Sequence, residues 1–341
     1  MNGIVKVLVG LALLALLAMA VTYGIVQRKL DTPVAVPEDG LAFTIKPGAA
    51  FGRVARELES EGVLSSAWAL RVWARATDMA GRVQAGEYLI QPEATPRTLL
   101  EQFTSGDVRL YSFTIIEGWT HWELLAALHG DENIAVTMDN EDWAELLAEL
   151  GAESDYPEGL FLPETYRFPG ATTDRDVLRQ AYELMQTTLA EEWAERAPDA
   201  PVETPYEALV LASIVEKETA RADERERIAG VFARRLDKRM RLQTDPTVIY
   251  GIGPEFNGNL TRRDLRTDTP YNTYRRHGLP PTPIAMPGRA AIRAALNPSD
   301  GTELFFVATG LGDGSHKFST TKDEHDAAVR EYLQRLRNNR R

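Results

Sequence analysis

Two glutamates lie two residues apart near the end of one predicted helix. At about 100° of rotation per residue, Glu218 shares a helix face with Leu211, Ile214 and Val215. Glu216 lies on nearly the opposite face and extends no comparable apolar stripe. A carboxyl group beside a bulky apolar stripe is partly desolvated, which disfavours its charged form and raises its pKa. Glu218 is therefore the better candidate for a general acid that works near neutral pH.

The same glutamate also has a structural interpretation. At a frayed helix end it would pair with Arg221 or Arg225, which follow it in the chain. Exposed ion pairs of this kind contribute only about 0–1 kcal/mol and carry no chemistry. Helical geometry alone leaves both interpretations open.

Short strands and amphipathic helices alternate along the rest of the chain, which predicts an α+β fold. In a first module we expect a strand at 42–45, two helices, a returning strand at 86–90 and a helix that begins at Thr95-Pro96. Further elements are expected at 111–116, 120–128, 139–150, 174–196, 205–220, 223–239, 304–308, 317–319 and 321–337. The segment 240–298 is rich in Gly, Pro, Thr and Asn, so we expect a long loop that forms a binding surface.

An uncharged segment of 20 residues, 7–26, lies near the N-terminus. As a helix it would extend about 30 Å, the hydrocarbon thickness of a bilayer. The alternative is a cleaved signal peptide, because Ala18-Met19-Ala20 resembles a cleavage site. The apolar run continues past that site, so we favour an uncleaved single-pass anchor over residues 1–29, followed by a polar linker at 30–40.

Composition restricts the class of function. The 341 residues include 44% hydrophobic and 26% charged residues, which indicates a packed core. A net charge of −12 argues against nucleic acid as a partner. The chain has no cysteine, and its five histidines show no HExxH spacing, so we expect neither a metal site nor a cofactor. These two observations leave open a metal site made of carboxylates alone.

Several distinctive motifs lie in a fixed order along the chain. The helix motif is Ala212-Ser-Ile-Val-Glu-Lys-Glu-Thr219, and the most distinctive block is Met240-Arg-Leu-Gln-Thr-Asp-Pro-Thr-Val-Ile-Tyr-Gly251. The other motifs are Glu158-Gly-Leu-Phe-Leu-Pro-Glu-Thr165, Thr269-Pro-Tyr-Asn-Thr-Tyr274, Gly278-Leu-Pro-Pro281, Ile284-Ala285, Pro287-Gly288 and Phe305-Phe-Val-Ala308. In residues and order they resemble the motifs of the endolytic murein transglycosylase (YceG-like) family, and the resemblance covers nearly the whole chain.

This resemblance implies a lyase that cuts the β-1,4 bond between N-acetylmuramic acid and N-acetylglucosamine inside peptidoglycan strands. The product would end in 1,6-anhydro-N-acetylmuramic acid, and cleavage would terminate nascent strands. The resemblance also implies a single-pass inner-membrane protein that faces the cell wall, with peptidoglycan synthases as partners. It implies a LysM-like module, here 41–108, and a catalytic domain, here 109–341. The family's catalytic residue is the second glutamate of the helix motif, which is Glu218 in this sequence.

On this interpretation the segment after residue 240 would hold the sugars. Side chains suited to hydrogen bonds with hydroxyl and N-acetyl groups are Gln243, Asp245, Asn272 and Asn297. Tyr271, Tyr274 and Phe318 offer aromatic faces, Glu164 offers a further carboxylate, and His316 is a further candidate. Each also has a structural interpretation: Asp245-Pro246 and Asn297-Pro298 are turn signals, and the aromatic residues would equally fit a core.

Two rival functions remain open on the sequence. A muramidase-type hydrolase would use Glu218 as the acid and Asp245 or Glu164 as the second carboxylate. A membrane-tethered adaptor would bind peptidoglycan without cleaving it.

Overall fold

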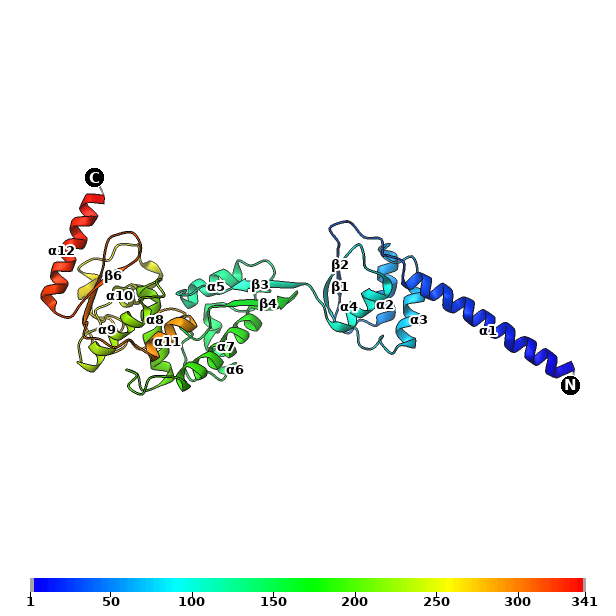
Figure 1. Ribbon diagram of the computed structural model, residues 1–341, viewed down its shortest axis with the longest axis horizontal. Helices are drawn as coiled ribbons and strands as arrows, with labels where there is room; N and C mark the ends of the chain where they lie inside the picture. The colour runs from blue at the N-terminus through cyan, green and yellow to red at the C-terminus, as the bar shows by residue number, and fades with distance from the viewer. Residues whose placement is uncertain (1–2, 340–341) are drawn as a thin grey trace. The chain divides into compact units, whose positions relative to one another are not determined.

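A computed structural model describes residues 3–339 of the chain, which divide into two compact units (Figure 1). The first unit comprises the residues up to 111 together with 167–171, and the second comprises the rest. The elements within the first segment are α1 (Gly3–Leu30), β1 (Leu41–Ile45), α2 (Phe51–Ser60), α3 (Ala67–Ala76), β2 (Gly86–Ile90) and α4 (Pro96–Ser105).

A small core of helices and one strand pair forms the first unit. Strands β1 and β2 are antiparallel, and Phe43 lies opposite Tyr88. The Tyr88 ring packs edge-on against Phe103 of α4 at 4.7 Å between ring centroids. Helix α4 begins where the sequence predicts, because the Thr95 hydroxyl accepts a hydrogen bond from the backbone of Thr98 and Pro96 occupies the first turn. The expected order of strand, two helices and strand is therefore present.

Helix α1 has two parts with different surroundings. Its segment Lys6–Leu30 has a mean hydropathy of 2.4 and is long and apolar enough to cross a membrane. Near its C-terminal end, however, Val26 and Leu30 belong to the buried core of the first unit. The apolar helix thus continues directly into the folded module.

The second unit is mixed helix and strand, which confirms the predicted α+β class. Strand β3 (Leu110–Thr114) pairs with β4 (Thr165–Pro169), and the division between the units passes through both strands. The remaining elements are α5 (His121–His129), η1 (Asn140–Asp142), α6 (Trp143–Glu149), α7 (Asp174–Ala194), α8 (Pro205–Glu218), α9 (Arg225–Asp237), α10 (Asp245–Ile252), η2 (Gly253–Glu255), η3 (Asp264–Arg266), α11 (Arg289–Leu296), β5 (Phe305–Ala308), β6 (His316–Ser319) and α12 (Lys322–Asn339).

Helix α8 lies at the centre of the second unit (Figure 1). It contacts α7, α9, α10 and α11, and every residue from Ala208 to Val215 is buried. Strands β5 and β6 form an antiparallel hairpin that packs against α12. A helix that is apolar on all sides is stable only when others surround it, which explains why α8 is central.

The expectation of a continuous loop over 240–298 is wrong. Helix α10 begins at Asp245 with Pro246 in its first turn, so Asp-Pro starts a helix here and does not mark a simple turn. Helix α11 buries Ala291, Ile292 and Leu296. Its run of small residues lets it pack closely, a signal that the surrounding Gly and Pro obscured.

Candidate functional site

Glu218 is the last residue of α8, where the central helix reaches the surface of its unit. The predicted stripe of Leu211, Ile214 and Val215 is fully buried, and Glu218 is half-buried. The helix ends here because Thr219 takes an extended backbone conformation while its N–H still donates to the Val215 carbonyl. The packed helix therefore fixes the position of the Glu218 backbone.

A threonine hydroxyl at the start of the neighbouring helix α10 holds the Glu218 carboxyl group. Thr244, which precedes α10, donates a hydrogen bond from its hydroxyl to Glu218 Oε1. Burial raises the pKa of Glu218. The Thr244 hydrogen bond opposes that rise and the charge of Asp245 adds to it, while His316 and Arg235 act weakly to lower the pKa. The net direction is upward, as a general acid requires.

The turn that carries Thr244 is rigid. Its hydroxyl-bearing neighbours Thr247 and Thr273 are buried, and their Oγ1 atoms lie 2.8 Å apart. The Thr244 N–H donates to Thr273 Oγ1 at 3.1 Å. Gln243 is exposed, has a left-handed φ of 52°, and its N–H donates to the Thr273 carbonyl at 3.2 Å. These bonds direct Thr244 toward Glu218 and leave the Gln243 side chain in solvent.

Two of the predicted polar contacts lie beside this turn. Asp245 accepts a hydrogen bond from Tyr274 Oη at 2.6 Å. Burial and this bond to a carboxylate raise the pKa of Tyr274, so the phenol stays protonated. Asp245 is exposed and its charge acts on Glu218, so the structure brings Asp245, Tyr274 and Glu218 together.

The β5–β6 hairpin supplies the remaining predicted neighbours. His316 Nδ1 lies 2.7 Å from Glu224 Oε2, and the His316 N–H donates to Glu224 Oε1 at 3.0 Å. A positive charge on His316 acts to lower the pKa of Glu218. The Phe318 ring is covered on one face by Arg227, whose guanidinium carbon lies 4.0 Å from the ring centroid. The guanidinium occupies the position on that face that a sugar ring would need.

Other predicted residues have different surroundings. Asn272 is fully buried, and its amide donates to the carbonyls of residues 264, 265 and 267 while its Oδ1 accepts from the Tyr274 N–H. Asn297 directly follows α11, and its amide donates to the Arg293 carbonyl. Glu164 lines a separate hollow with Glu117 and Arg225. Asn272 and Asn297 thus bind backbone carbonyls, and Glu164 lies at another surface. None of the hydrogen bonds of these three side chains joins them to Glu218.

Glu216 has a distinct role on its own face of α8. Its Oε2 accepts from the Gly288 N–H at 3.0 Å, and Arg225 Nη2 lies 3.6 Å from its Oε1. Burial raises the pKa of Glu216, and the bond from Gly288 and the charge of Arg225 oppose that rise. Arg225, which the structural interpretation paired with Glu218, therefore pairs with Glu216. The other arginine of that interpretation, Arg221, pairs with Asp223 and Glu224.

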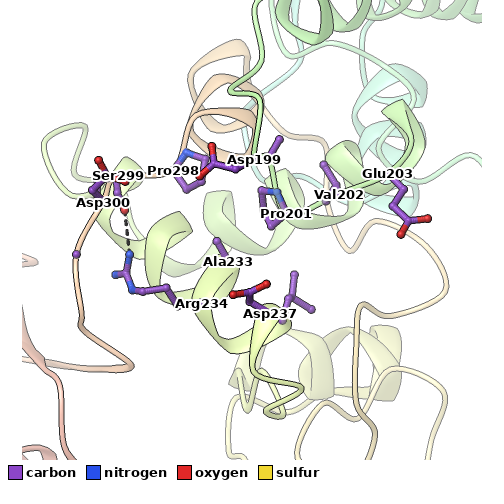
Figure 2. A pocket seen from close by; sticks show the side chains of 13 residues that line it. Asp199, Pro201, Val202, Glu203, Ala233, Arg234, Asp237, Pro298, Ser299 and Asp300 are labelled. Carbon is purple, nitrogen blue, oxygen red and sulfur yellow. Dashed lines mark hydrogen bonds between the residues drawn. The ribbon is translucent and has the colours of Figure 1, made fainter.

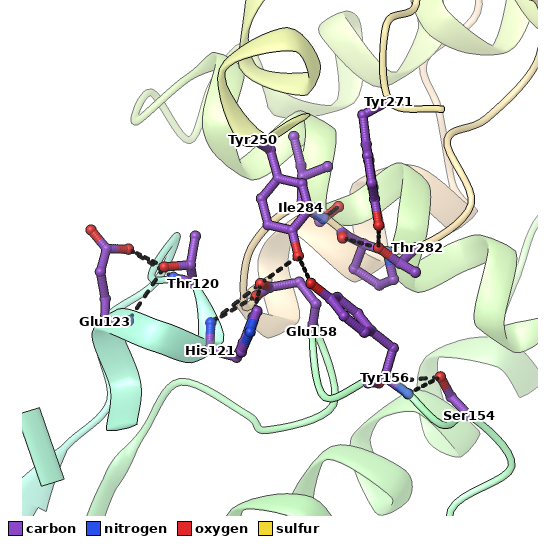
Figure 3. Close-up of polar contacts among 12 residues, drawn as sticks. Thr120, His121, Glu123, Ser154, Tyr156, Glu158, Tyr250, Tyr271, Thr282 and Ile284 are labelled. Atoms are coloured by element: carbon purple, nitrogen blue, oxygen red, sulfur yellow. Dashed lines mark hydrogen bonds and ion pairs between the residues drawn. The ribbon is translucent and has the colours of Figure 1, made fainter. Parts of the chain in front are cut away.

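Sequence reasoning missed a buried network around Glu158 (Figure 3). Glu158 is fully buried and accepts hydrogen bonds from the His121 N–H at 3.2 Å and from Tyr250 Oη at 2.9 Å. His121 Nδ1 lies 2.7 Å from its Oε2. Tyr271 joins this network, with its ring 4.9 Å from that of Tyr250. The only signal in the sequence was Glu158 within a family motif, which gives no indication of its partners.

A second hollow, of about 460 Å³, lies between the ends of α9 and α11 (Figure 2). Four carboxylate side chains line it, those of Asp199, Glu203, Asp237 and Asp300. Arg234 also lines it and donates to the Ser299 carbonyl at 2.9 Å. No predicted site residue lines this hollow, so the candidate site is the one around Glu218.

Comparisons with known proteins identify the family of this chain. The sequence model of the YceG-like family matches residues 43–331. The endolytic murein transglycosylase of Bacillus subtilis (strain 168) is 28% identical over 306 residues, covering 85% of this chain and 84% of the relative. A protein of the same name from Streptococcus pneumoniae (strain D39) is 26% identical and covers 95% of this chain, which spans only 64% of that relative. A crystal structure of a YceG-like protein from Listeria monocytogenes has a TM-score of 0.52 at 25% identity and covers 85% of this chain and 99% of its own. With a family match over most of its length, this chain belongs to the YceG-like family.

Proposed function

We propose that this protein is an endolytic lytic transglycosylase of peptidoglycan. It cleaves the bond between N-acetylmuramic acid and N-acetylglucosamine within a strand and leaves a 1,6-anhydro end. The observation that carries the proposal is Glu218, a half-buried carboxyl group with a raised pKa that a threonine hydroxyl orients at the end of the central helix. The relatives named endolytic murein transglycosylase, which align over most of the chain, support it.

The reaction needs one proton carrier. Protonated Glu218 gives its proton to the glycosidic oxygen as the bond from that oxygen to C1 breaks. The resulting carboxylate then accepts the proton of the C6 hydroxyl as O6 bonds to C1. The nucleophile belongs to the substrate, so its effective concentration is already high and no water is consumed. Glu218 ends as it began, protonated.

A muramidase-type hydrolase remains the second candidate, because Asp245 lies close enough for its charge to act on Glu218. A hydrolase would use that carboxylate to activate water. Digestion of purified peptidoglycan in water labelled with heavy oxygen separates the two. We expect unlabelled anhydro ends by mass spectrometry, whereas labelled reducing ends would establish hydrolysis.

The decisive substitution is Glu218→Gln, which keeps size and polarity but removes the acid. We expect the variant to fold normally and to lose about 10²–10⁴-fold of its cleavage rate. Glu226→Gln, on an exposed face of α9, is the matched control and should cleave normally. Cleavage that survives in Glu218→Gln would move the role to Glu216 or Glu164. Binding without any released fragment from the unsubstituted protein would favour the adaptor.

The setting of the enzyme completes the proposal. Helix α1 anchors the protein in the inner membrane by a single pass, with the catalytic unit on the cell-wall side, where peptidoglycan lies. The module at 41–108 is LysM-like. Peptidoglycan synthases are the partners, and cleavage terminates the strands that they make. The apolar length of α1 and the strand, helix, helix, strand order of the module support this arrangement.

A further inference from the structure

A groove of about 420 Å³ lies in the second unit and holds none of the site residues predicted from the sequence. The residues of its lining that matter here are Trp122, Lys217, Pro246, Ile249 and Phe256. They come from α5, the end of α8, α10 and the turn after α10. The lining also includes the Tyr250 ring and Glu123, whose Oε2 accepts hydrogen bonds from the N–H and hydroxyl of Thr120. The groove thus combines aromatic rings and aliphatic carbon with one ammonium group and one carboxylate that already has partners.

The groove adjoins the Glu218 site through two separate elements. Lys217 of the groove directly precedes Glu218 on α8. Pro246 of the groove follows Thr244, the hydroxyl partner of Glu218, by two residues. Adjacent Cα atoms are about 3.8 Å apart, so both walls bring the groove to within a sugar's reach of the acid. A strand that reacts at Glu218 is therefore within reach of these walls.

Trp122 is held as a rigid platform in this groove. Its ring stacks on Tyr250 with centroids 5.2 Å apart and planes 25° apart. Tyr250 is itself fixed, because its hydroxyl donates to buried Glu158, which also binds the His121 backbone next to Trp122 (Figure 3). An aromatic ring supported in this way loses little conformational freedom when a ligand stacks on it.

Lys217 provides a charge at the groove edge. It is exposed, and its Nζ donates to the Gly118 carbonyl at 3.0 Å. Among residues 3–339, no carboxylate forms an ion pair with Lys217. A carboxylate on the ligand would therefore pair with the Lys217 ammonium group without displacing another carboxylate.

From these contacts we propose that the groove is a sugar subsite next to the scissile bond. Trp122 stacks on the apolar face of one N-acetylated pyranose ring, and Lys217 pairs with a carboxylate carried by the peptide substituent of the strand. The inference rests on the proposed function, because it assigns the strand that Glu218 cleaves. It adds a residue pair, Trp122 and Lys217, that determines how the strand lies.

The test measures binding in the Glu218→Gln background, so that cleavage does not interfere. The probe is purified, peptide-bearing peptidoglycan strands, and the protein is the full chain in detergent. We expect Trp122→Ala to weaken binding about tenfold, since an aromatic contact contributes about 0.5–1.5 kcal/mol beyond its area. Trp122→Phe should recover most of the affinity. The matched control is Trp193→Ala on α7, whose ring packs under Arg196 and does not line the groove.

A second substitution keeps the test informative if Trp122→Ala is unstable. Lys217→Met should weaken binding at low salt and flatten its salt dependence, whereas Lys238→Met, exposed after α9, should do neither. Unchanged affinity in Lys217→Met, or in a folded Trp122→Ala, would overturn the subsite. That result would leave the proposed function intact, because the cleavage products of the unsubstituted protein test it separately.

Discussion

The chemistry proposed for this protein depends on the environment of one carboxyl group. Glu218 is desolvated at the end of an apolar helix, so its neutral form is favoured. The Thr244 hydroxyl opposes this, because a donated hydrogen bond stabilises the carboxylate. Desolvation therefore favours the protonated form that bond cleavage needs, and the hydroxyl stabilises the anion that follows it.

Thr244→Val tests this balance. Valine keeps the shape of threonine but cannot donate, so the carboxylate loses its partner and the pKa of Glu218 rises further. The first step needs the protonated acid, so activity falls as pH rises through that pKa. We therefore expect the alkaline limb of the kcat/KM profile to move to higher pH.

Thr247→Val is the control for this shift. Thr247 lies in the same buried hydroxyl cluster, and its Oγ1 donates to the Thr244 carbonyl rather than to Glu218. Because Thr247→Val leaves the Thr244 hydroxyl in place, it should lower stability and move the alkaline limb less than Thr244→Val does. A limb that stays in place, or moves to lower pH, in Thr244→Val would contradict the assigned role of the hydroxyl.

At the scale of elements, the site forms where α8, the turn before α10 and the β5–β6 hairpin meet. The helical stripe on α8 predicted Glu218, because local periodicity determines which residues share a face. Thr244 and Arg235 could not be predicted, because a hydrogen bond between residues 26 apart depends on packing that no local pattern encodes. Asn272 shows the converse, since its type suits a sugar but its neighbours direct it to the backbone.

Arg235 of α9 joins these elements. It is 7% exposed, and it donates to the Leu304 carbonyl before β5 and to the Leu242 carbonyl before the Thr244 turn, both at 2.6 Å. Arg235→Met would leave two carbonyls without a donor. We expect it to destabilise the second unit by about 3 kcal/mol. We also expect a lower cleavage rate, because the Thr244 turn loses one of the contacts that hold it.

Amide hydrogen exchange in β5 measures this loss directly. Arg235→Lys keeps the charge but lacks the fork that reaches both carbonyls, so it should recover little. Lys238→Met, exposed one residue beyond the same helix, should leave exchange unchanged. Equal protection of β5 in Arg235→Met and in the unsubstituted protein would show that the two carbonyls find other partners.

For the whole molecule, the main question is how an apolar helix is joined to a folded module. Helix α1 does not end at a flexible tether, because its last turns are part of the first unit's core. Arg97 Nε also binds Asp31 Oδ1 at 3.0 Å, just past the helix end. The helix and the module therefore share residues, and the exact point of truncation matters for stability.

Two truncated chains test this sharing. Removing residues 1–22 deletes most of the exposed apolar surface of α1 but keeps Val26 and Leu30. Removing residues 1–31 deletes these two side chains and Asp31 as well. Each buried aliphatic side chain contributes about 1.5–3 kcal/mol, so the longer truncation should destabilise the first unit by about 3 kcal/mol or more. Hydrogen exchange of the paired strands β1 and β2 should report a faster opening in that chain alone. Equal protection of the β1–β2 pair in both chains would mean that the end of α1 only rests on the module and does not stabilise it.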